Sequence, residues 1–314
     1  MNNSVFRSKR FLFGIGYFIV LLAASFFVGQ HHDLFFSEHQ TLIMNEKGEI
    51  VKETPFDPWT APPFGTDRQG NSMFFKLLDG ARFTILIVFS ICAIQMVLGI
   101  LIGGATAYAP SFIRRGIEQI CQVYLYIPTI LWSIVLMMPL MVQSGQEGYR
   151  FSLILYQCAV LVCVSLPPLI LAIGKEMQWM NKQEYVISSR LLGAGTLHVF
   201  RKHAWPYMRE TIVVLFLQQV VQTLILLIHL GFFEIIIGGR MIKTDILTGE
   251  ASVHPFVNEW SSIIGLSRDE LIHAPWIALS PLVMYMVTIF VTNAMIEGMK
   301  GSGKWRMYSV LNNK

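Results

Sequence analysis

The stretch EYVISSRLLGAGTLHVFRKHAWP, residues 184–206, decides how the chain is organised, because it is polar and broken by glycine within a sequence of mostly apolar runs. Residues 182–192 contain no helix breaker and predict a short helix, after which the GAG at 193–195 allows a sharp turn. Thr196 can cap a second short helix that ends at Pro206. The stretch therefore predicts a helix–turn–helix element.

Composition indicates what surrounds this element. The 314-residue chain is 54% hydrophobic and 14% charged, whereas a soluble domain usually carries about 25% charged residues. Six apolar runs are long enough to cross a hydrocarbon core about 30 Å thick as helices. Prolines in the third and fourth runs predict kinks there. We expect an all-α integral membrane protein with six transmembrane helices, at residues 11–29, 84–108, 119–141, 152–173, 211–237 and 276–296.

The distribution of Lys and Arg predicts the orientation of these spans. With the amino terminus in the cytoplasm, 15 of the 24 Lys and Arg residues lie on that side. Both termini are then cytoplasmic, and so is the connection at 174–210 that contains the opening stretch. Basic residues before the first run would also suit a signal peptide, but the run is long and no A-x-A cleavage site follows it. We expect an uncleaved first span in a multi-pass protein of the cell membrane.

Sequence patterns typical of enzymes and metal sites do not occur in the chain. It has no HExxH and no GxSxG, and the only charged residues or histidines in the expected spans are His229 and Glu234. The four cysteines form no CxxC pair, so no zinc site or disulfide framework is indicated. GMKGSGKW (298–305) matches the start of a phosphate-binding loop, but Trp305 replaces the required Ser or Thr. We therefore expect no catalytic residues, no metal and no cofactor.

The connection at 174–210 is longer than a simple link between two spans requires. Two to eight residues would suffice to join neighbouring helices. Its small residues Ser188 and Ser189 and its basic side chains, such as Arg190, favour a docking element for a cytoplasmic partner.

The opening stretch resembles the cytoplasmic coupling loop of binding-protein-dependent ABC importer permeases, whose pattern is E-A-A, three residues, G, nine residues and I-x-L-P. Glu184, Gly193 and Pro206 occupy the glutamate, glycine and proline positions. The closest likeness is to the C-type permease subunit of dipeptide and oligopeptide importers, whose loop reads roughly E-Y-V-x-A-A-R-x-L-G-A. PFGTDRQGNSMFFKLLDGAR (63–82) and APWIALSPLVMYMVTIFVTNAMIEGMK (274–300) resemble two further segments of that subfamily, so the likeness covers about residues 55–300.

The sequence departs from the family pattern at several positions. The paired alanines are replaced by Ser188 and Ser189, which are also small, and His203 and Trp205 replace the apolar residues before the proline. LGFFEIIIGG (230–239) replaces the family's L-S-F-L-G-L-G-like end of span five. This last change weakens an inference about the solute more than one about coupling.

The resemblance implies a type I ABC importer transmembrane domain and a set of partners. Two permease subunits would form the pathway, the second one not identical to this chain. Two cytoplasmic ATP-binding subunits would supply ATP turnover, and an extracytoplasmic solute-binding protein would deliver the solute. Membrane lipid is a further partner and nucleic acid is not. The solute would be a peptide or a related small solute. Nickel chelates or another non-peptide solute are the alternative, and a scaffold or channel without ATP coupling is the alternative of another class.

The expected spans and the resemblance together divide the chain into four regions. Residues 1–29 would be the amino-terminal tail and first transmembrane helix. Residues 30–83 would be an extracytoplasmic loop, in which 73–82 are an interfacial helix with its apolar side chains in the membrane surface, an elbow leading into the second span, or a contact for the binding protein. Residues 84–300 would be the permease core of five transmembrane helices with the coupling loop at 174–210. Residues 301–314 would be a cytoplasmic tail.

The resemblance assigns ATPase coupling to the opening stretch. The small serines would allow close approach to the ATPase, Glu184 and Arg190 would pair with charges in its groove, and Gly193 would make the bend. The full set expected to act in coupling is Glu184, Tyr185, Ser188, Ser189, Arg190, Gly193, Ala194 and Pro206.

Polar residues on the fifth span predict either a solute path or interhelical hydrogen bonds. Gln218, Gln222 and His229 share one helix face with Ile225 at spacings of four, seven and eleven. On the second span, Gly99, Gly103 and Ala107 form a stripe of small residues that predicts close helix packing.

Overall fold

The computed structural model describes residues 8–36, 42–44, 50–141, 150–244 and 251–300; the expected tail at 301–314 lies outside them. Helices dominate the described residues, with two antiparallel hairpins of two strands each, β1 with β2 and β3 with β4. The elements in chain order are α1 (Lys9–Gln30), α2 (His32–Phe36), β1 (Leu42–Met44), β2 (Ile50–Glu53), α3 (Met73–Tyr108), α4 (Ser111–Tyr124), α5 (Thr129–Met141), α6 (Arg150–Asn181), α7 (Glu184–Leu191), α8 (Thr196–Val199), the π-helix η2 (Phe200–Ala204), α9 (Trp205–Phe232), β3 (Arg240–Thr244), β4 (Ala251–Pro255), α10 (Trp260–Leu266), the 3₁₀-helix η3 (Arg268–Leu271) and α11 (Pro275–Lys300).

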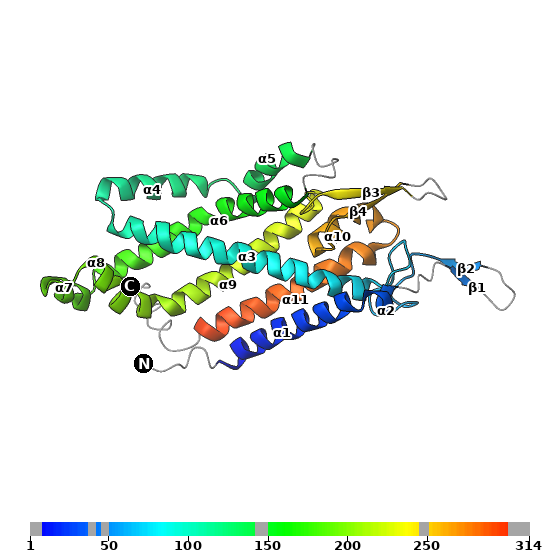
Figure 1. Ribbon diagram of the computed structural model, residues 1–314, viewed down its shortest axis with the longest axis horizontal. Helices are drawn as coiled ribbons and strands as arrows, with labels where there is room; N and C mark the ends of the chain where they lie inside the picture. The colour runs from blue at the N-terminus through cyan, green and yellow to red at the C-terminus, as the bar shows by residue number, and fades with distance from the viewer. Residues whose placement is uncertain (1–7, 37–41, 45–49, 142–149, 245–250, 301–314) are drawn as a thin grey trace.

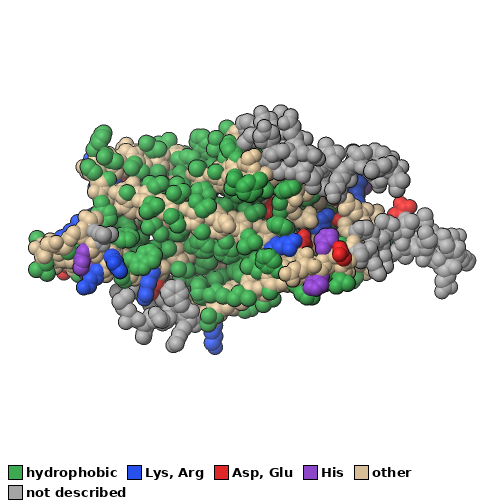
Figure 2. All heavy atoms as spheres, viewed as in Figure 1, with side chains coloured by type: hydrophobic (Ala, Val, Ile, Leu, Met, Phe, Trp, Pro, Cys, Tyr) green, Lys and Arg blue, Asp and Glu red, His purple; other side chains and the backbone are tan. Residues whose placement is uncertain are grey.

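Five long helices, α1, α3, α6, α9 and α11, run along the length of the molecule (Figure 1). Each is long and apolar enough to cross a membrane, and the bent pair α4 and α5 brings the number to six if it counts as one span. On the face shown in Figure 2, apolar side chains cover the middle of the molecule and charged side chains gather toward its two ends. The expected all-α integral membrane class is confirmed.

The two ends of the bundle carry different structures. α7 and α8 lie at one end, together with the start of α1 and the end of α11, whereas α10 and the hairpins lie at the other (Figure 1). Arg10 and Glu297 form an ion pair of 3.2 Å that joins α1 to α11 at the first of these ends. We call these the α7 end and the α10 end.

The third expected span, 119–141, is wrong as a single straight helix. α4 already begins at Ser111, and it is bent by 84° from α5 across a short break that contains Pro128. Proline lacks the N–H that a continuous helix needs at this position. The rings of Tyr124 and Trp132 stack across the break with centroids 5.2 Å apart, which holds the bend.

The fourth span contains two prolines, yet α6 continues through both of them. Pro168 cannot donate the usual hydrogen bond to the carbonyl of Val164, four residues earlier. The Tyr124 hydroxyl donates to that carbonyl instead, over 2.9 Å. A neighbouring helix therefore satisfies the backbone group that the proline leaves open, as a membrane environment requires.

The small-residue stripe on α3 does pack closely, against α6. A Cβ atom added at Gly99 would lie 2.7 Å from the Leu169 side chain, and one at Gly103 would lie 2.9 Å from the Ile170 carbonyl oxygen. Gly174 makes the same approach from α6, because a Cβ there would lie 3.0 Å from the Thr106 hydroxyl. The two helices are in backbone contact, as the sequence predicts.

Two expected boundaries differ in the structure. The interfacial helix at 73–82 is not a separate element, since these residues are the first turns of α3 and bury Met73, Leu77 and Ala81 inside the protein. The fifth span was expected to reach residue 237, but α9 ends at Phe232. Glu234 therefore lies after the helix and not within it.

The short helix α10 is an element that hydropathy does not predict. Its N-cap residue Glu259 is fully buried, and its carboxylate accepts hydrogen bonds from the N–H and hydroxyl groups of Ser261 and Ser262 and from the Tyr285 hydroxyl at 2.8 Å. The Trp260 indole donates to the Leu77 carbonyl of α3 at 2.8 Å. α10 is thereby fixed to α3 and α11.

Candidate functional site

The polar stretch identified in the sequence forms a helical element that projects from the α7 end of the bundle (Figure 1). We call residues 182–204 the projecting element. Its small core consists of Val186 from α7, Val199 from α8 and Ala204 from η2, packed on Met180 at the end of α6, and all four are buried. Val186 and Val199 are the apolar residues that hold α7 against the second half of the element.

The turn inside the projecting element depends on Gly193. Its backbone has φ +89°, the left-handed conformation that glycine adopts without steric cost. The N–H of Gly193 donates to the Arg190 carbonyl at 2.9 Å, and the N–H of Ala194 donates to the Ser189 carbonyl at 3.1 Å. This pair of bonds is a Schellman motif that ends α7. Ala194 then packs against the small core.

The second half of the element does not end at Pro206, as the sequence had suggested. α8, the π-helix η2 and α9 follow one another without a gap, and Pro206 stands in the first turn of α9. Because the helical backbone continues from η2, the missing N–H of Pro206 falls inside the run, directly after the π-helical turn that interrupts the regular hydrogen-bond pattern. The projecting element is therefore joined directly to the span that carries Gln222 and His229.

The outward surface of α7 is apolar at its tip. Leu191 and Leu192 are 84% and 90% exposed, and Tyr185 and Ile187 on the same helix are each 47% exposed. The quoted family pattern has a leucine at the position of Leu192, but neither leucine was among the residues expected to act in coupling. Two consecutive leucines beside the turn glycine, on a helix outside the spans, are the sequence signal that could have found them.

The remaining residues expected to act in coupling divide into outward and inward groups. Glu184 and Ser188 are exposed, and Ser189 is half-buried. Arg190 donates to the Asn181 side chain at 3.0 Å and lies over the Tyr108 ring, so it contacts the bundle as well as solvent. Tyr185 packs beside the His203 ring, and partial burial raises the pKa of its phenol.

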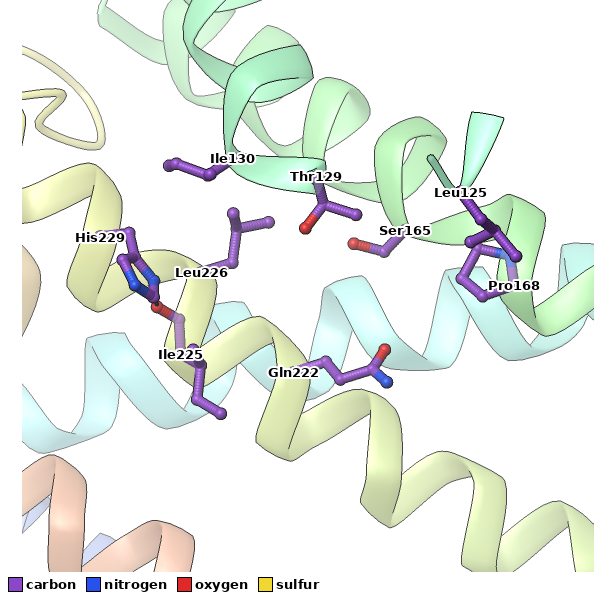
Figure 3. Close-up of a pocket in the computed structure, with 9 residues that line it drawn as sticks. All are labelled: Leu125, Thr129, Ile130, Ser165, Pro168, Gln222, Ile225, Leu226 and His229. Carbon is purple, nitrogen blue, oxygen red and sulfur yellow. Dashed lines mark hydrogen bonds between the residues drawn. The ribbon is translucent and has the colours of Figure 1, made fainter. Parts of the chain in front are cut away.

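A second site lies between the spans, where the break between α4 and α5 meets α6 and α9. It is a pocket of about 370 Å³ (Figure 3). Its walls mix apolar side chains with hydroxyl, amide and imidazole groups. The lining residues are Leu125, Thr129, Ile130, Ser165, Pro168, Gln222, Ile225, Leu226 and His229.

Two of the three residues expected on a solute path share this pocket. Gln222 and His229, both on α9, line the pocket, and both side chains are exposed. Gln218 is half-buried and does not line the pocket. The Nδ1 atom of His229 lies 2.7 Å from the Ile225 carbonyl oxygen, one turn earlier on the helix. Thr129 and Ser165, which the sequence did not single out, complete the polar lining.

The α10 end carries ion pairs, two of which connect the turn after α9 to β3 and η3. Glu234 pairs with Arg240 at 3.2 Å and with Arg268 at 3.3 Å. Asp67, in the turn before α3, pairs with Lys76 at 2.7 Å. Within the described residues, no group of three or more His, Cys, Asp or Glu side chains is arranged to hold a metal ion.

A bundle of membrane-spanning helices with a polar pocket beside a broken span, and a helical element projecting from one end, defines a membrane transport protein. The chain belongs to the family of binding-protein-dependent transport system inner membrane components, which it matches over residues 95–299. It is the permease component of such a system, and the resemblance found in the sequence is confirmed.

Curated relatives agree with this family. The chain is 24% identical over 236 residues to a di/tripeptide transport system permease protein of Pseudomonas aeruginosa, covering 75% of this chain and 69% of the relative. It is 22% identical over 244 residues to a glutathione transport system permease protein of Pectobacterium atrosepticum, covering 77% and 72%. It is 23% identical over 239 residues to a putative peptide permease protein of Brucella abortus, covering 76% and 70%.

Proposed function

We propose that this chain is a permease subunit of an ATP-driven importer of short peptides, and that the projecting element receives the movement produced by ATP turnover in separate subunits. The observation that carries the proposal is the build of that element. Four buried side chains make it a compact body, while Leu191 and Leu192 stay almost fully exposed beyond the spans. Exposed apolar pairs of this kind are anchors for a partner surface.

The partners follow from this role. A second, non-identical permease subunit would complete the pathway, two ATP-binding subunits would seat the projecting elements, and a solute-binding protein would dock at the α10 end. Peptides are the proposed solute because curated relatives are named as di/tripeptide and peptide permeases.

The proposed orientation places the α7 end in the cytoplasm. The basic side chains of Arg190, Arg201, Lys202 and Arg209 gather there, as the positive-inside rule requires. The start of α1 and the end of α11 lie at the same end, so both termini would be cytoplasmic. Residues 30–72 would then form the extracytoplasmic loop.

The solute path is proposed to pass Gln222 and His229, and then Gln218, which lies one turn before Gln222 on the same helix. Their pocket lies beside the break between α4 and α5, and irregular backbone within a membrane is tolerated where it lines a cavity. The direct connection from η2 into α9 supplies a physical link between the projecting element and this pocket.

The docking role can be tested by placing charge on the exposed leucines. We expect Leu191→Glu with Leu192→Glu to abolish co-purification of the ATP-binding subunits and ATP-dependent peptide uptake, because burying two carboxylates where the leucines would be buried is costly. Ile272→Glu is the matched control, since Ile272 is 86% exposed at the α10 end. That variant should retain the ATP-binding subunits.

Retention of the ATP-binding subunits by the double leucine variant would contradict the docking role. Uptake that proceeds without any ATP-binding subunit would instead favour a channel that is not coupled to ATP.

A further inference from the structure

We infer that the pocket beside the broken span binds the carboxylate of the solute in transit, with the solute's N–H groups directed toward His229. This inference rests on the proposed function and adds to it the chemical group that is recognised. The pocket has one side rich in hydrogen-bond donors and one acceptor at its far side. A short peptide with free ends has the complementary arrangement.

The first donor group is the start of α5. This helix has 13 residues and begins at the break, with Thr129 in the pocket lining. The N–H of Leu131 bonds the Pro128 carbonyl, so the N–H groups of Thr129 and Ile130 have no acceptor within the helix. The helix dipole adds partial positive charge at this end, which favours an anion.

The second donor is Ser165, and it points to a ligand independently of the helix end. Ser165 is only 6% exposed, yet its hydroxyl makes no hydrogen bond with the part of the chain that the structure describes. A helical serine usually bonds the carbonyl four residues earlier, but here the Gln95 amide already donates to that Leu161 carbonyl at 3.1 Å. Figure 3 shows the Ser165 and Thr129 hydroxyls directed toward each other, both on the side of the pocket formed by α5 and α6.

The acceptor is His229, on the opposite wall from these hydroxyls (Figure 3). A carbonyl oxygen can only accept, so the Nδ1 atom that bonds the Ile225 carbonyl carries the proton. In the neutral imidazole the Nε2 atom is then an acceptor for an N–H of the solute. Gln222, which can donate and accept, lies about two turns before His229 on α9 and also lines the pocket.

A pocket lined without Lys or Arg suits a site that must release its solute better than a site that binds it tightly. None of the nine lining residues is Lys or Arg. Hydroxyl groups and a helix end bind a carboxylate less tightly than a buried guanidinium would, and a transit site must release its solute. The volume of about 370 Å³ is within the range of small-molecule sites.

The test uses the whole importer, with its partner permease, ATP-binding subunits and binding protein, reconstituted in liposomes. Thr129→Val combined with Ser165→Ala removes both hydroxyls at nearly constant volume. We expect uptake of labelled trialanine per ATP hydrolysed to fall roughly tenfold, because two hydrogen bonds to a charged group are lost. Uptake of trialanine amide should change less than twofold. ATP turnover stimulated by the loaded binding protein should persist, which shows that the complex is assembled.

The matched controls are Ser133→Ala and Thr129→Ser. Ser133 lies one turn farther along α5, bonds the Thr129 carbonyl and does not line the pocket, so its loss should leave uptake unchanged. Thr129→Ser keeps the hydroxyl and, in the Ser165→Ala background, should recover part of the uptake.

The outcomes separate the two claims. A double variant that imports trialanine as well as Ser133→Ala does, or that loses the acid and the amide in parallel, overturns the carboxylate site. If the unmodified complex does not import trialanine amide, the test is decided by uptake of trialanine alone, compared between the double variant and Ser133→Ala. An unmodified complex that imports neither solute overturns the proposed peptide function and this inference with it.

Discussion

Gly193 and Glu234 occupy the same position in two helix-ending turns of the same type, one at each end of the bundle. Gly193 follows α7 with φ +89°, and Glu234 follows α9 with φ +58°. In both turns the next residue donates its N–H to a carbonyl five residues earlier, Ala194 to Ser189 and Ile235 to Leu230. The turn at the α7 end has the residue that this geometry favours, and the turn at the α10 end has one that it disfavours.

Gly193→Ala should weaken the turn of the projecting element. A Cβ at Gly193 would meet nothing within 4 Å, so the cost is conformational only, about 1 kcal/mol. We expect reduced peptide uptake with the membrane bundle intact. Gly195→Ala is the control, since Gly195 also has free space around its Cα and no positive φ. Equal uptake by the two variants would show that the turn does not limit coupling.

Glu234→Gly and Glu234→Gln should have opposite effects on stability. Glycine removes a left-handed strain of about 1 kcal/mol, whereas the half-exposed ion pairs with Arg240 and Arg268 contribute about 0–1 kcal/mol. Glutamine loses the charge and keeps the strain. Thermal unfolding in detergent should therefore rank the glycine variant above the glutamine variant. Both variants lose the ion pairs, so the opposite ranking would show that the positive φ of residue 234 costs no measurable stability.

Glu259→Gln should destabilise the α10 end. The buried carboxylate accepts from five donors, and an amide in its place would direct an N–H group toward some of them, at a cost of about 3 kcal/mol. We expect a lower unfolding temperature and a lower yield of folded protein. Glu297→Gln, at an exposed carboxylate, is the control and should change stability by less than about 0.5 kcal/mol. If Glu259→Gln left the unfolding temperature unchanged, the carboxylate would not be needed at this position.

Gly80→Ala and Gly16→Ala should separate close packing from helix propensity. A Cβ at Gly80 of α3 would lie 2.0 Å from the Asn258 carbonyl oxygen, so the backbone must move, at a cost of about 3 kcal/mol. A Cβ at Gly16 of α1 would meet nothing within 4 Å, and alanine should stabilise that helix by about 0.5–1 kcal/mol. Unfolding in detergent measures both, and a stable Gly80→Ala variant would refute the close approach.

Hydropathy predicts most of the fold because spans are defined by length and apolarity, which are local properties. Five long helices appear where apolar runs occur, and the stripe of Gly99 and Gly103 marks the contact with α6. The break at Pro128 and the intact helix at Pro168 could not be told apart from sequence. Their difference depends on Tyr124, which donates to the carbonyl left open in α6 and stacks across the break.

The site residues that the sequence predicts are those with a local signal. Gly193 is visible in the sequence because a turn needs it, and Gln222 and His229 are visible as polar residues in a span. Ser165 and Glu259 were not, because a serine in an apolar run and a glutamate in a loop are ordinary. Their roles arise from burial against segments far away in the chain, such as the contact between Glu259 and Tyr285.

The backbone contact between α3 and α6 has a mechanical consequence. An added Cβ atom at Gly99, Gly103 or Gly174 would lie only 2.7–3.0 Å from the other helix, so the two helices are packed too closely to slide past each other and would tilt as one stiff rod. α6 has 32 residues, which at 1.5 Å each gives a rod of about 48 Å, and a tilt of roughly 5° about one end moves the other by about 4 Å. A rotation of only a few degrees would therefore shift the far tip by more than the diameter of a water molecule.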